Sequence, residues 1–248
     1  MSLRIDACLA RHQGDRLEQQ DRVDLVVHPD QPGLVLAVLG DGMGGHSGGG
    51  LAADQLVVRA RQNFAAYHPS GESPRAFLEG VVQDAHVMVT LSGYTSEQNP
   101  HTTAVLLLLQ GPSAWWAHCG DSRLYRFRGA APLGHTQDHS LVEGLVREGR
   151  ISAGEAENHP QRHILLSCLG GKVLPQVEHG HAAVLVAGDA FLLCSDGLWA
   201  HFSDQELGDL IASHRARESA GILVDLARQR ARGGGDNISL ALVKVVET

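Results

Sequence analysis

The chain has 248 residues, of which 43% are hydrophobic and 19% are charged, and its formal net charge is −8. This composition predicts a folded globular protein and excludes a disordered one, and the length fits one domain with a sizeable core. The acidic balance argues against a nucleic-acid partner, which would need a surface rich in Lys and Arg. We therefore expect a single domain over residues 1–248.

The cysteines and apolar segments bear on where the protein acts. Cys8, Cys119, Cys168 and Cys194 are far apart, and no two form a Cys-x-x-Cys pair. We therefore expect reduced thiols, with no disulfide framework or zinc site. The N-terminus lacks the apolar segment of a signal peptide, and the apolar stretch 104–109 is too short to cross a bilayer. These features predict a cytoplasmic protein without membrane insertion.

The predicted elements begin with a strand over the apolar run Leu34–Leu39. A helix follows over Leu51–Tyr67, because its apolar residues recur on one face. A second helix begins at Ser73, an N-cap residue, with Pro74 at the first helical position. The next strand is expected over Thr102–Leu109. The first half of the chain therefore places two consecutive helices between strands.

The second half contains more strands and several short helices. Trp115–Cys119 and Leu124–Phe127 are separated by a tight turn and predict a hairpin. Ser152 and Ser203 each have glutamate three residues later, the spacing of a capping box at the start of a helix. Three further strands and one further helix are expected over Ala182–Val186, Phe191–Cys194, Ile238–Val246 and Glu218–Arg230.

This grouping of elements predicts the fold class. A doubly wound parallel sheet would alternate strands and helices regularly, whereas here strands and helices occur in groups. Grouped strands favour antiparallel sheets covered by helices, and this number of strands favours two stacked sheets. We therefore expect an α+β protein.

Five aspartates occupy turns or strand ends. Asp41 and Asp196 follow apolar strands, Asp236 follows three glycines, Asp121 lies in the hairpin turn, and Asp21 lies near the N-terminus. One Asp-Gly after a strand is usually a turn, so the prediction rests on the combination. Converging carboxylates repel one another unless cations neutralise them, and hard oxygen ligands select Mg²⁺, Mn²⁺ or Ca²⁺. The pattern predicts a metal site that activates water for attack on phosphorus.

At this point the motifs, taken in order, resemble those of the metal-dependent protein phosphatases of type 2C, in particular the compact bacterial members. The resemblance runs from about residue 14 to residue 245 and implies an α-β-β-α sandwich, with two stacked antiparallel sheets flanked by helices. The motifs that carry it are Arg16…Asp21, Asp41-Gly42-Met43-Gly44-Gly45-His46, Thr102-Thr103-Ala104, Gly120-Asp121-Ser122-Arg123, Thr136-Gln137-Asp138-His139-Ser140, Ser195-Asp196-Gly197-Leu198 and Gly235-Asp236-Asn237.

The resemblance also implies ligands for two core Mn²⁺ or Mg²⁺ ions and a possible third. Asp41 would bridge the two core ions, and the Gly42 carbonyl would bind the second. Asp196 and Asp236 would bind the first core ion, and Asp121 would help to hold the third. The implied reaction is hydrolysis of phosphoserine and phosphothreonine in proteins by a metal-bridged hydroxide.

Two further residues and one segment receive roles from the resemblance. Asp21 would orient water beside the metals, and Arg16 would bind the substrate phosphate through its planar fork. Residues 141–165 would form a flap near the site. Met43 stands where many eukaryotic members carry a histidine proposed as general acid, and it cannot donate a proton. The nearby His46 is expected to be a solvated loop residue.

Other functions stay open at this point. A phosphoprotein-binding relative with weak catalysis is one alternative, and a hydrolase of small phosphorylated metabolites is another. The expected partners are phosphorylated proteins, a Ser/Thr kinase and its substrates, and we expect a monomer. His159, His163, His179 and His181 show no shared ligand spacing, so we expect surface histidines there.

Overall fold

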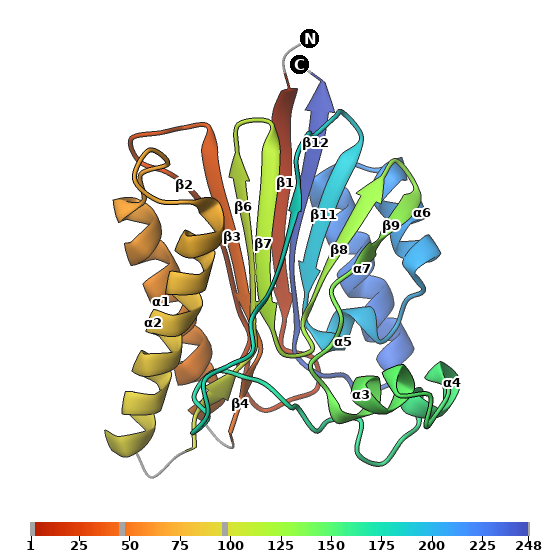
Figure 1. Ribbon diagram of the computed structural model, residues 1–248. Helices are drawn as coiled ribbons and strands as arrows, with labels where there is room; N and C mark the ends of the chain where they lie inside the picture. The colour runs from red at the N-terminus through yellow and green to blue at the C-terminus, as the bar shows by residue number, and fades with distance from the viewer. Residues whose placement is uncertain (1–2, 45–47, 96–98, 248) are drawn as a thin grey trace.

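Two five-stranded antiparallel sheets lie face to face between two layers of helices in the computed structural model (Figure 1). The structure describes residues 3–44, 48–95 and 99–247. In spatial order, the first sheet contains β1 (Leu3–His12), β12 (Ile238–Glu247), β11 (Asp189–Cys194), β8 (Arg123–Arg128) and β9 (Ala131–His135). The second contains β10 (Glu178–Ala182), β7 (Ser113–Cys119), β6 (Ala104–Gln110), β3 (Leu34–Gly40) and β2 (Arg22–Val27).

The helices cover the outer faces of the sheets. α1 (Gly48–Ala66) and α2 (Pro74–Thr95) pack on the second sheet, whereas α6 (Asp204–Ser213) and α7 (Ala216–Ala231) pack on the first (Figure 1). At the end of the sandwich opposite the chain termini are three short helices and a two-stranded sheet. These are α3 (Leu141–Arg147), α4 (Ala153–Glu157), α5 (Asp196–Trp199), β4 (Gly42–Met43) and β5 (His101–Thr102).

The alternation along β3 shows why the strand sequences are continuously apolar. Leu36 and Val38 face the helices α1 and α2, whereas Val35, Ala37 and Leu39 face the opposite sheet. Both faces of the strand are therefore buried, and neither can be polar. This confirms the predicted α-β-β-α sandwich. No helix within the described residues combines the length and apolar character that a bilayer crossing requires.

The hairpin predicted from Trp115–Cys119 and Leu124–Phe127 does not form, because β7 pairs with β6 and β10 in the second sheet whereas β8 pairs with β11 and β9 in the first. Two strand predictions were also wrong in their limits. The strand expected over Ala182–Val186 lies at Glu178–Ala182, because pairing with β7 ends at Ala182 opposite Ala114. The strand expected over Thr102–Leu109 is divided at Thr103, whose backbone N–H donates to the Asp41 carbonyl at 2.9 Å. The hydrogen bond at this break connects the start of β6 with Asp41, the residue that follows β3.

Candidate active site

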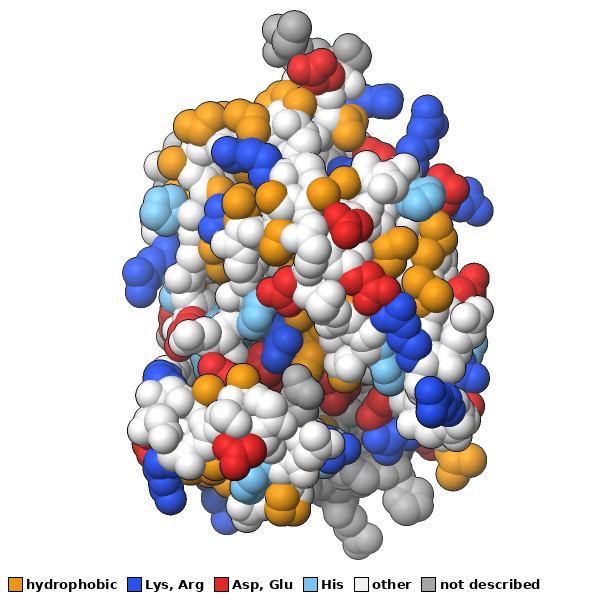
Figure 2. Space-filling model, turned by 90° about the vertical axis from the view of Figure 1, so that its right-hand side faces the viewer, with side chains coloured by type: hydrophobic (Ala, Val, Ile, Leu, Met, Phe, Trp, Pro, Cys, Tyr) orange, Lys and Arg blue, Asp and Glu red, His pale blue; other side chains and the backbone are white. Residues whose placement is uncertain are grey.

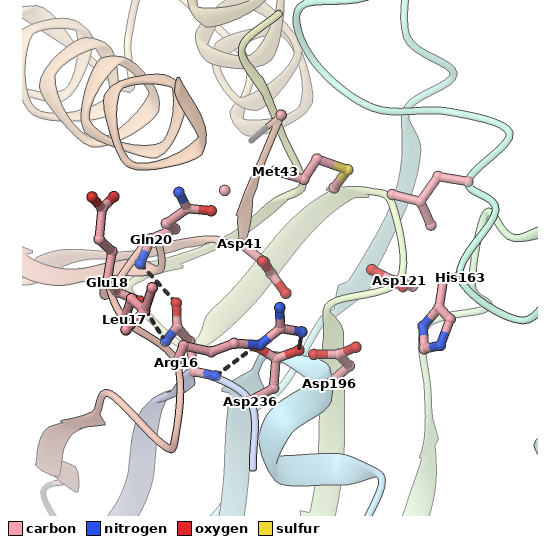
Figure 3. Close-up of a pocket in the computed structure, with 14 residues that line it drawn as sticks. Arg16, Leu17, Glu18, Gln20, Asp41, Met43, Asp121, His163, Asp196 and Asp236 are labelled. Atoms are coloured by element: carbon pink, nitrogen blue, oxygen red, sulfur yellow. Dashed lines mark hydrogen bonds and ion pairs between the residues drawn. The ribbon is translucent and has the colours of Figure 1, made fainter. Parts of the chain in front are cut away.

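A cavity of about 540 Å³ opens at the end of the sandwich where the strand-end aspartates meet. Asp41 follows β3, Asp121 lies between β7 and β8, Asp196 begins α5 one residue beyond the end of β11, and Asp236 precedes β12. Their carboxylates point toward one shared space in Figure 3. The two stacked sheets therefore bring together four predicted ligands that are up to 195 residues apart in the chain.

Asp21, the fifth predicted carboxylate, lies behind this cavity and not on its wall. Its side chain is fully buried, and Ser195 Oγ donates to Asp21 Oδ2 at 2.7 Å. Asp21 Oδ1 is buried without a hydrogen-bond partner within the described residues. An unsatisfied buried carboxylate oxygen is costly, so this atom favours a ligand or an ordered water beside it.

The electrostatics of the cluster favour binding of cations. Burial, followed by repulsion from neighbouring carboxylates, raises the pKa of Asp196 to about 8 and that of Asp41 well above its usual value. Burial is also the first cause that raises the pKa values of Asp21 and Asp121 to about 6. These side chains resist ionisation unless a cation is added, which is the behaviour of a metal-binding carboxylate cluster.

Arg16 supplies a cation to this cluster. Its Nη2 donates to Asp236 Oδ2 at 2.5 Å, and its guanidinium reaches beside Asp196 (Figure 3). Its own pKa is raised, first by the hydrogen bond to Asp236 and further by the charges of Asp196 and Asp41. The carboxylates thus attract a cation where divalent metals are expected, and the donor set fits Mg²⁺ or Mn²⁺.

The backbone around Asp41 is fixed by close approaches. Thr103 Oγ1 accepts from the Asp41 N–H at 2.9 Å. A Cβ at Gly42 would lie 2.1 Å from the Gly49 carbonyl oxygen, so only glycine allows β4 to pass the start of α1. Gly42 also lines the cavity, so its backbone lies beside the carboxylates.

Asn237 organises the loop that presents Arg16. Its Nδ2 donates to the carbonyls of Gln13 and Glu18 at 2.7 and 2.9 Å, and its Oδ1 accepts from the Gln20 N–H. The amide cannot be replaced by a carboxylate, because a carboxylate has no hydrogens to donate. Asn237, the residue next to Asp236, therefore fixes the loop that carries Arg16, the residue expected to bind the phosphate.

A half-buried group of contacts connects the turn of Asp121 with the helix of Asp196. The Arg123 guanidinium bonds both Asp138 carboxylate oxygens at 2.8 and 2.9 Å and lies 3.6 Å from the centre of the Trp199 ring. Trp199 Nε1 donates to the Asp121 carbonyl at 3.0 Å. Trp199 thereby sets the position of the Asp121 backbone relative to α5.

We expect Trp199→Phe to weaken Mn²⁺ binding and to raise the Mn²⁺ concentration that half-saturates the cavity about tenfold. The phenyl ring keeps the stacking surface but cannot bond the Asp121 carbonyl. Trp115→Phe is the control, since Trp115 stacks on His181 away from the cavity. Equal Mn²⁺ dependence in the two variants would contradict the positioning role of Trp199.

Residues from two further segments line the cavity and were not predicted as site residues. Glu18 belongs to the Arg16 loop, and His163 and Leu165 come from the predicted flap. His163 faces the carboxylates from the side opposite Arg16 in Figure 3. In the sequence, only the position of His163 within the predicted flap could have indicated that it lines the site. Met43 lines the cavity as well, whereas His46 lies outside the described residues.

The prediction for histidines was only partly right. His163 and His181 are exposed, but the His179 side chain is only 9% exposed and bonds Glu79. His118 and His139, which showed no ligand pattern in the sequence, are buried side by side with a ring-centroid separation of 4.7 Å. Their contact depends on the pairing of distant segments, so spacing along the chain could not reveal it.

The chain matches known phosphatases in sequence. The family model described as protein phosphatase 2C matches residues 10–221. The serine/threonine protein phosphatase PstP of Mycobacterium tuberculosis is 35% identical over 219 residues, which are 87% of this chain and 41% of PstP. The protein phosphatase PhpP of Streptococcus pneumoniae is 33% identical over 94% of both chains. This chain therefore spans less than half of PstP but nearly all of PhpP.

Solved structures share the fold over almost the whole chain. A serine/threonine phosphatase from S. agalactiae superposes with a TM-score of 0.88 at 28% identity, covering 98% of this chain and all of the other. The catalytic domain of PstP in complex with two manganese ions gives a TM-score of 0.82 at 28% identity, covering 99% and 100%. Together with the converging aspartates, these matches show that the chain belongs to the protein phosphatase 2C family.

Proposed function

We propose that the protein is a metal-dependent serine/threonine protein phosphatase. The observation that carries this proposal is the convergence of Asp41, Asp121, Asp196 and Asp236 on one cavity that Arg16 also lines. Such a cavity combines a site for hard divalent cations with a planar donor for phosphate oxygens. The names of PstP and PhpP support the same reaction class.

The chain's own atoms fit the expected metals. Asp41, the Gly42 carbonyl, Asp196 and Asp236 would hold two core Mn²⁺ or Mg²⁺ ions, and Asp121 would help to hold a third. The PstP catalytic domain with two manganese ions supports this assignment. When bound, the ions would supply Lewis acidity and lower the pKa of water.

Arg16 acts on the phosphate and Asp21 on water in this proposal. The Arg16 guanidinium now bonds Asp236, and metal ions at the carboxylates would free it to bond two phosphate oxygens. Asp21 is held by Ser195, so its free oxygen has a fixed position from which to orient a water molecule. Neither role requires a covalent phosphoenzyme.

We expect Arg16→Lys to raise KM for a phosphothreonine peptide about tenfold, with a smaller change in kcat. Lysine keeps the positive charge but cannot bond two oxygens of one phosphate in a plane. Steady-state kinetics at saturating Mn²⁺ test this, with Arg61→Lys as a control, because Arg61 bonds Asp24 outside the cavity. An unchanged KM would remove Arg16 from phosphate binding.

Residues 141–165 act as a flap beside the cavity in this proposal. The segment contains α3 and α4, and backbone bonds hold its ends together, since Leu141 N donates to the Ile164 carbonyl at 2.8 Å. His163 and Leu165 present the flap to the cavity. The ends of the segment are held together, whereas the residues between them are largely exposed. This arrangement suits a segment that contacts the substrate protein.

The proposed substrates are phosphoproteins, and the proposed partners are a Ser/Thr kinase and its targets in a bacterial signalling pathway. On the face shown in Figure 2, Lys and Arg side chains are dispersed among acidic and neutral ones, which fits a protein partner better than a nucleic acid. The four cysteines are free, which supports a cytoplasmic location, and we propose a monomer.

Turnover of a phosphothreonine peptide, a small phosphoester and a nucleotide monophosphate, compared at equal Mn²⁺, tests the substrate class. The proposal expects kcat/KM to be highest for the peptide. Preference for the nucleotide would favour a metabolite hydrolase. Peptide binding without turnover at any divalent metal would favour the phosphoprotein-binding alternative.

A further inference from the structure

Two histidines and a glutamate form a second cluster of metal-ligating side chains, next to the turn that carries Asp121. His118 lies on β7, His139 lies between β9 and α3, and Glu178 lies on β10. Each offers one ligand atom, and these atoms lie within 4.8 Å of one another. None of the three lines the acidic cavity, so the cluster is separate from the proposed catalytic centre.

Backbone pairing builds this cluster. His118 and Glu178 are direct partners in the antiparallel ladder of β7 and β10, so their side chains lie on the same face. The His139 N–H donates to the Gly120 carbonyl at 2.9 Å, and the His139 carbonyl accepts from Leu166 N–H at 2.7 Å. All three positions are therefore fixed by hydrogen bonds of the main chain.

One ring nitrogen of each histidine has no hydrogen-bond partner in the part of the chain that the structure describes. His118 Nδ1 and His139 Nε2 are buried and make no hydrogen bond within residues 3–44, 48–95 and 99–247. The two residues are only 2% and 8% exposed. Buried polar atoms normally have partners, so a ligand that both nitrogens can bind would satisfy them together.

His118 has the tautomer of a metal ligand. Its Nε2–H donates to the Gln137 carbonyl at 2.8 Å, which leaves the unpartnered Nδ1 with a lone pair that can bind a metal. Metal-ligating histidines commonly donate their other N–H to a carbonyl in this way. Burial lowers the pKa values of His118 and His139, so both rings are neutral near pH 7 and available as ligands.

Binding of a metal by His139 would break one of its hydrogen bonds. The Gly120 N–H donates to His139 Nδ1 at 3.3 Å, a long hydrogen bond. Coordination through Nε2 places the ring proton on Nδ1 and breaks this bond. His139 Nε2 lies 3.6 Å from Glu178 Oε1, close to the separation of two ligands around a tetrahedral ion with bonds of about 2.0–2.1 Å. One weak contact is therefore exchanged for a coordination bond.

We propose that His118, His139 and Glu178 bind one Zn²⁺ ion, with water as the fourth ligand. Two imidazoles and one carboxylate are a ligand set for zinc, whereas the carboxylates of the acidic cavity suit Mg²⁺ or Mn²⁺. The Glu178 side chain is 40% exposed, which gives the ion a path from solvent and leaves room for water. The site contains no cysteine, and its three ligands have no recognisable spacing along the chain, so the sequence alone could not predict it.

Zinc binding to the untagged protein, measured by equilibrium dialysis with Mg²⁺ in excess, tests this site. We expect one zinc equivalent whose affinity falls about tenfold or more in Glu178→Gln and further in His118→Asn. His179→Asn is the matched control, because His179 is the next residue on β10 but bonds Glu79 outside the cluster. Its zinc affinity should equal that of the wild type.

Co²⁺ as a probe identifies the coordination, because tetrahedral Co²⁺ absorbs visible light far more strongly than octahedral Co²⁺. We expect the intense spectrum in wild type and His179→Asn and its loss in Glu178→Gln. Zinc held in the acidic cavity would be unaffected by Glu178→Gln, so equal affinities in wild type and Glu178→Gln would overturn the proposal. Glu178 is partly exposed, so we expect Glu178→Gln to fold. This variant therefore decides the test even if His118→Asn does not fold.

Discussion

Asp41→Asn is expected to lower kcat/KM for a phosphothreonine peptide about 10³-fold or more at saturating Mn²⁺, since this substitution removes a carboxylate that would hold the catalytic ions. Asparagine has nearly the same shape and keeps one oxygen, but it lacks the negative charge that neutralises the metals. Asp41 is surrounded by the charges of Asp21, Asp121, Asp196 and Asp236, so its contribution depends on that charge.

The loss should arise from the metal site and not from unfolding. Asp41 is held through its backbone by Thr103, and that bond does not involve the side chain that is changed. The control is Asp54→Asn, which removes a carboxylate that bonds Arg22 outside the cavity. Full activity in Asp41→Asn would show that this carboxylate holds no essential ion.

The second large effect concerns the stability of the metal-free protein. We expect Asp196→Asn to increase the free energy of unfolding by roughly 2–4 kcal/mol at pH 8, since one pKa unit corresponds to about 1.4 kcal/mol. Burial raises the folded-state pKa of Asp196 to about 8, whereas the unfolded value is near 4. Water in the cavity screens part of this cost, so the expected gain is smaller than the full difference between the two pKa values.

The sign of the pH dependence follows from proton binding. Between about pH 4 and pH 8 the folded chain keeps a proton on Asp196 that the unfolded chain releases, so this group makes stability fall as pH rises. Buried histidines such as His118 have lowered pKa values and act in the opposite direction near pH 6. Both proteins contain the same histidines, so the contribution of the histidines cancels in the difference between the free energies of unfolding of wild type and Asp196→Asn. That difference should increase from pH 5 to pH 8.

Urea unfolding of both proteins in the presence of a chelator measures this difference. Added Mn²⁺ should reverse the order at pH 8, because it stabilises the wild type by binding and binds the variant poorly. A wild type that is more stable than Asp196→Asn at every pH without metal would contradict the assignment of a strained carboxylate cluster.

The fold could be predicted largely because its central strands are buried on both faces. β3 is an apolar run, as is β11 after its first residue, and the strands are followed within two residues by Asp41 and Asp196. β1, β2 and β9 were not predicted, because they lie at sheet edges and are only partly buried. An edge strand such as Leu3–His12 tolerates Arg4 and Asp6, which weakens the alternating pattern.

The proposed metal ligands were predictable for a related reason. Asp41 and Asp196 each follow a buried strand. A carboxylate held at such a position indicates a bound cation in addition to a turn. Their convergence with Asp236 depends on the pairing of β11 with β12 and on the stacking of two sheets. The sequence motifs carried this information only through their resemblance to a family.

Contacts made by isolated residues could not be predicted. The bond from Trp199 to the Asp121 carbonyl joins two turns that are 78 residues apart. The pair of His118 and Glu178 depends on the exact register of β10, which the sequence placed too far along the chain. Such contacts follow from strand register and have no local signal.

The most direct test of the central claim is turnover of a phosphothreonine peptide by wild type and Asp196→Asn, each with Mn²⁺ added or removed by a chelator. The account predicts turnover by the wild type with Mn²⁺ only, and its near-complete loss in the variant. Equal turnover with the chelator, or no turnover by folded wild type with any divalent metal, would contradict a metal-dependent phosphatase.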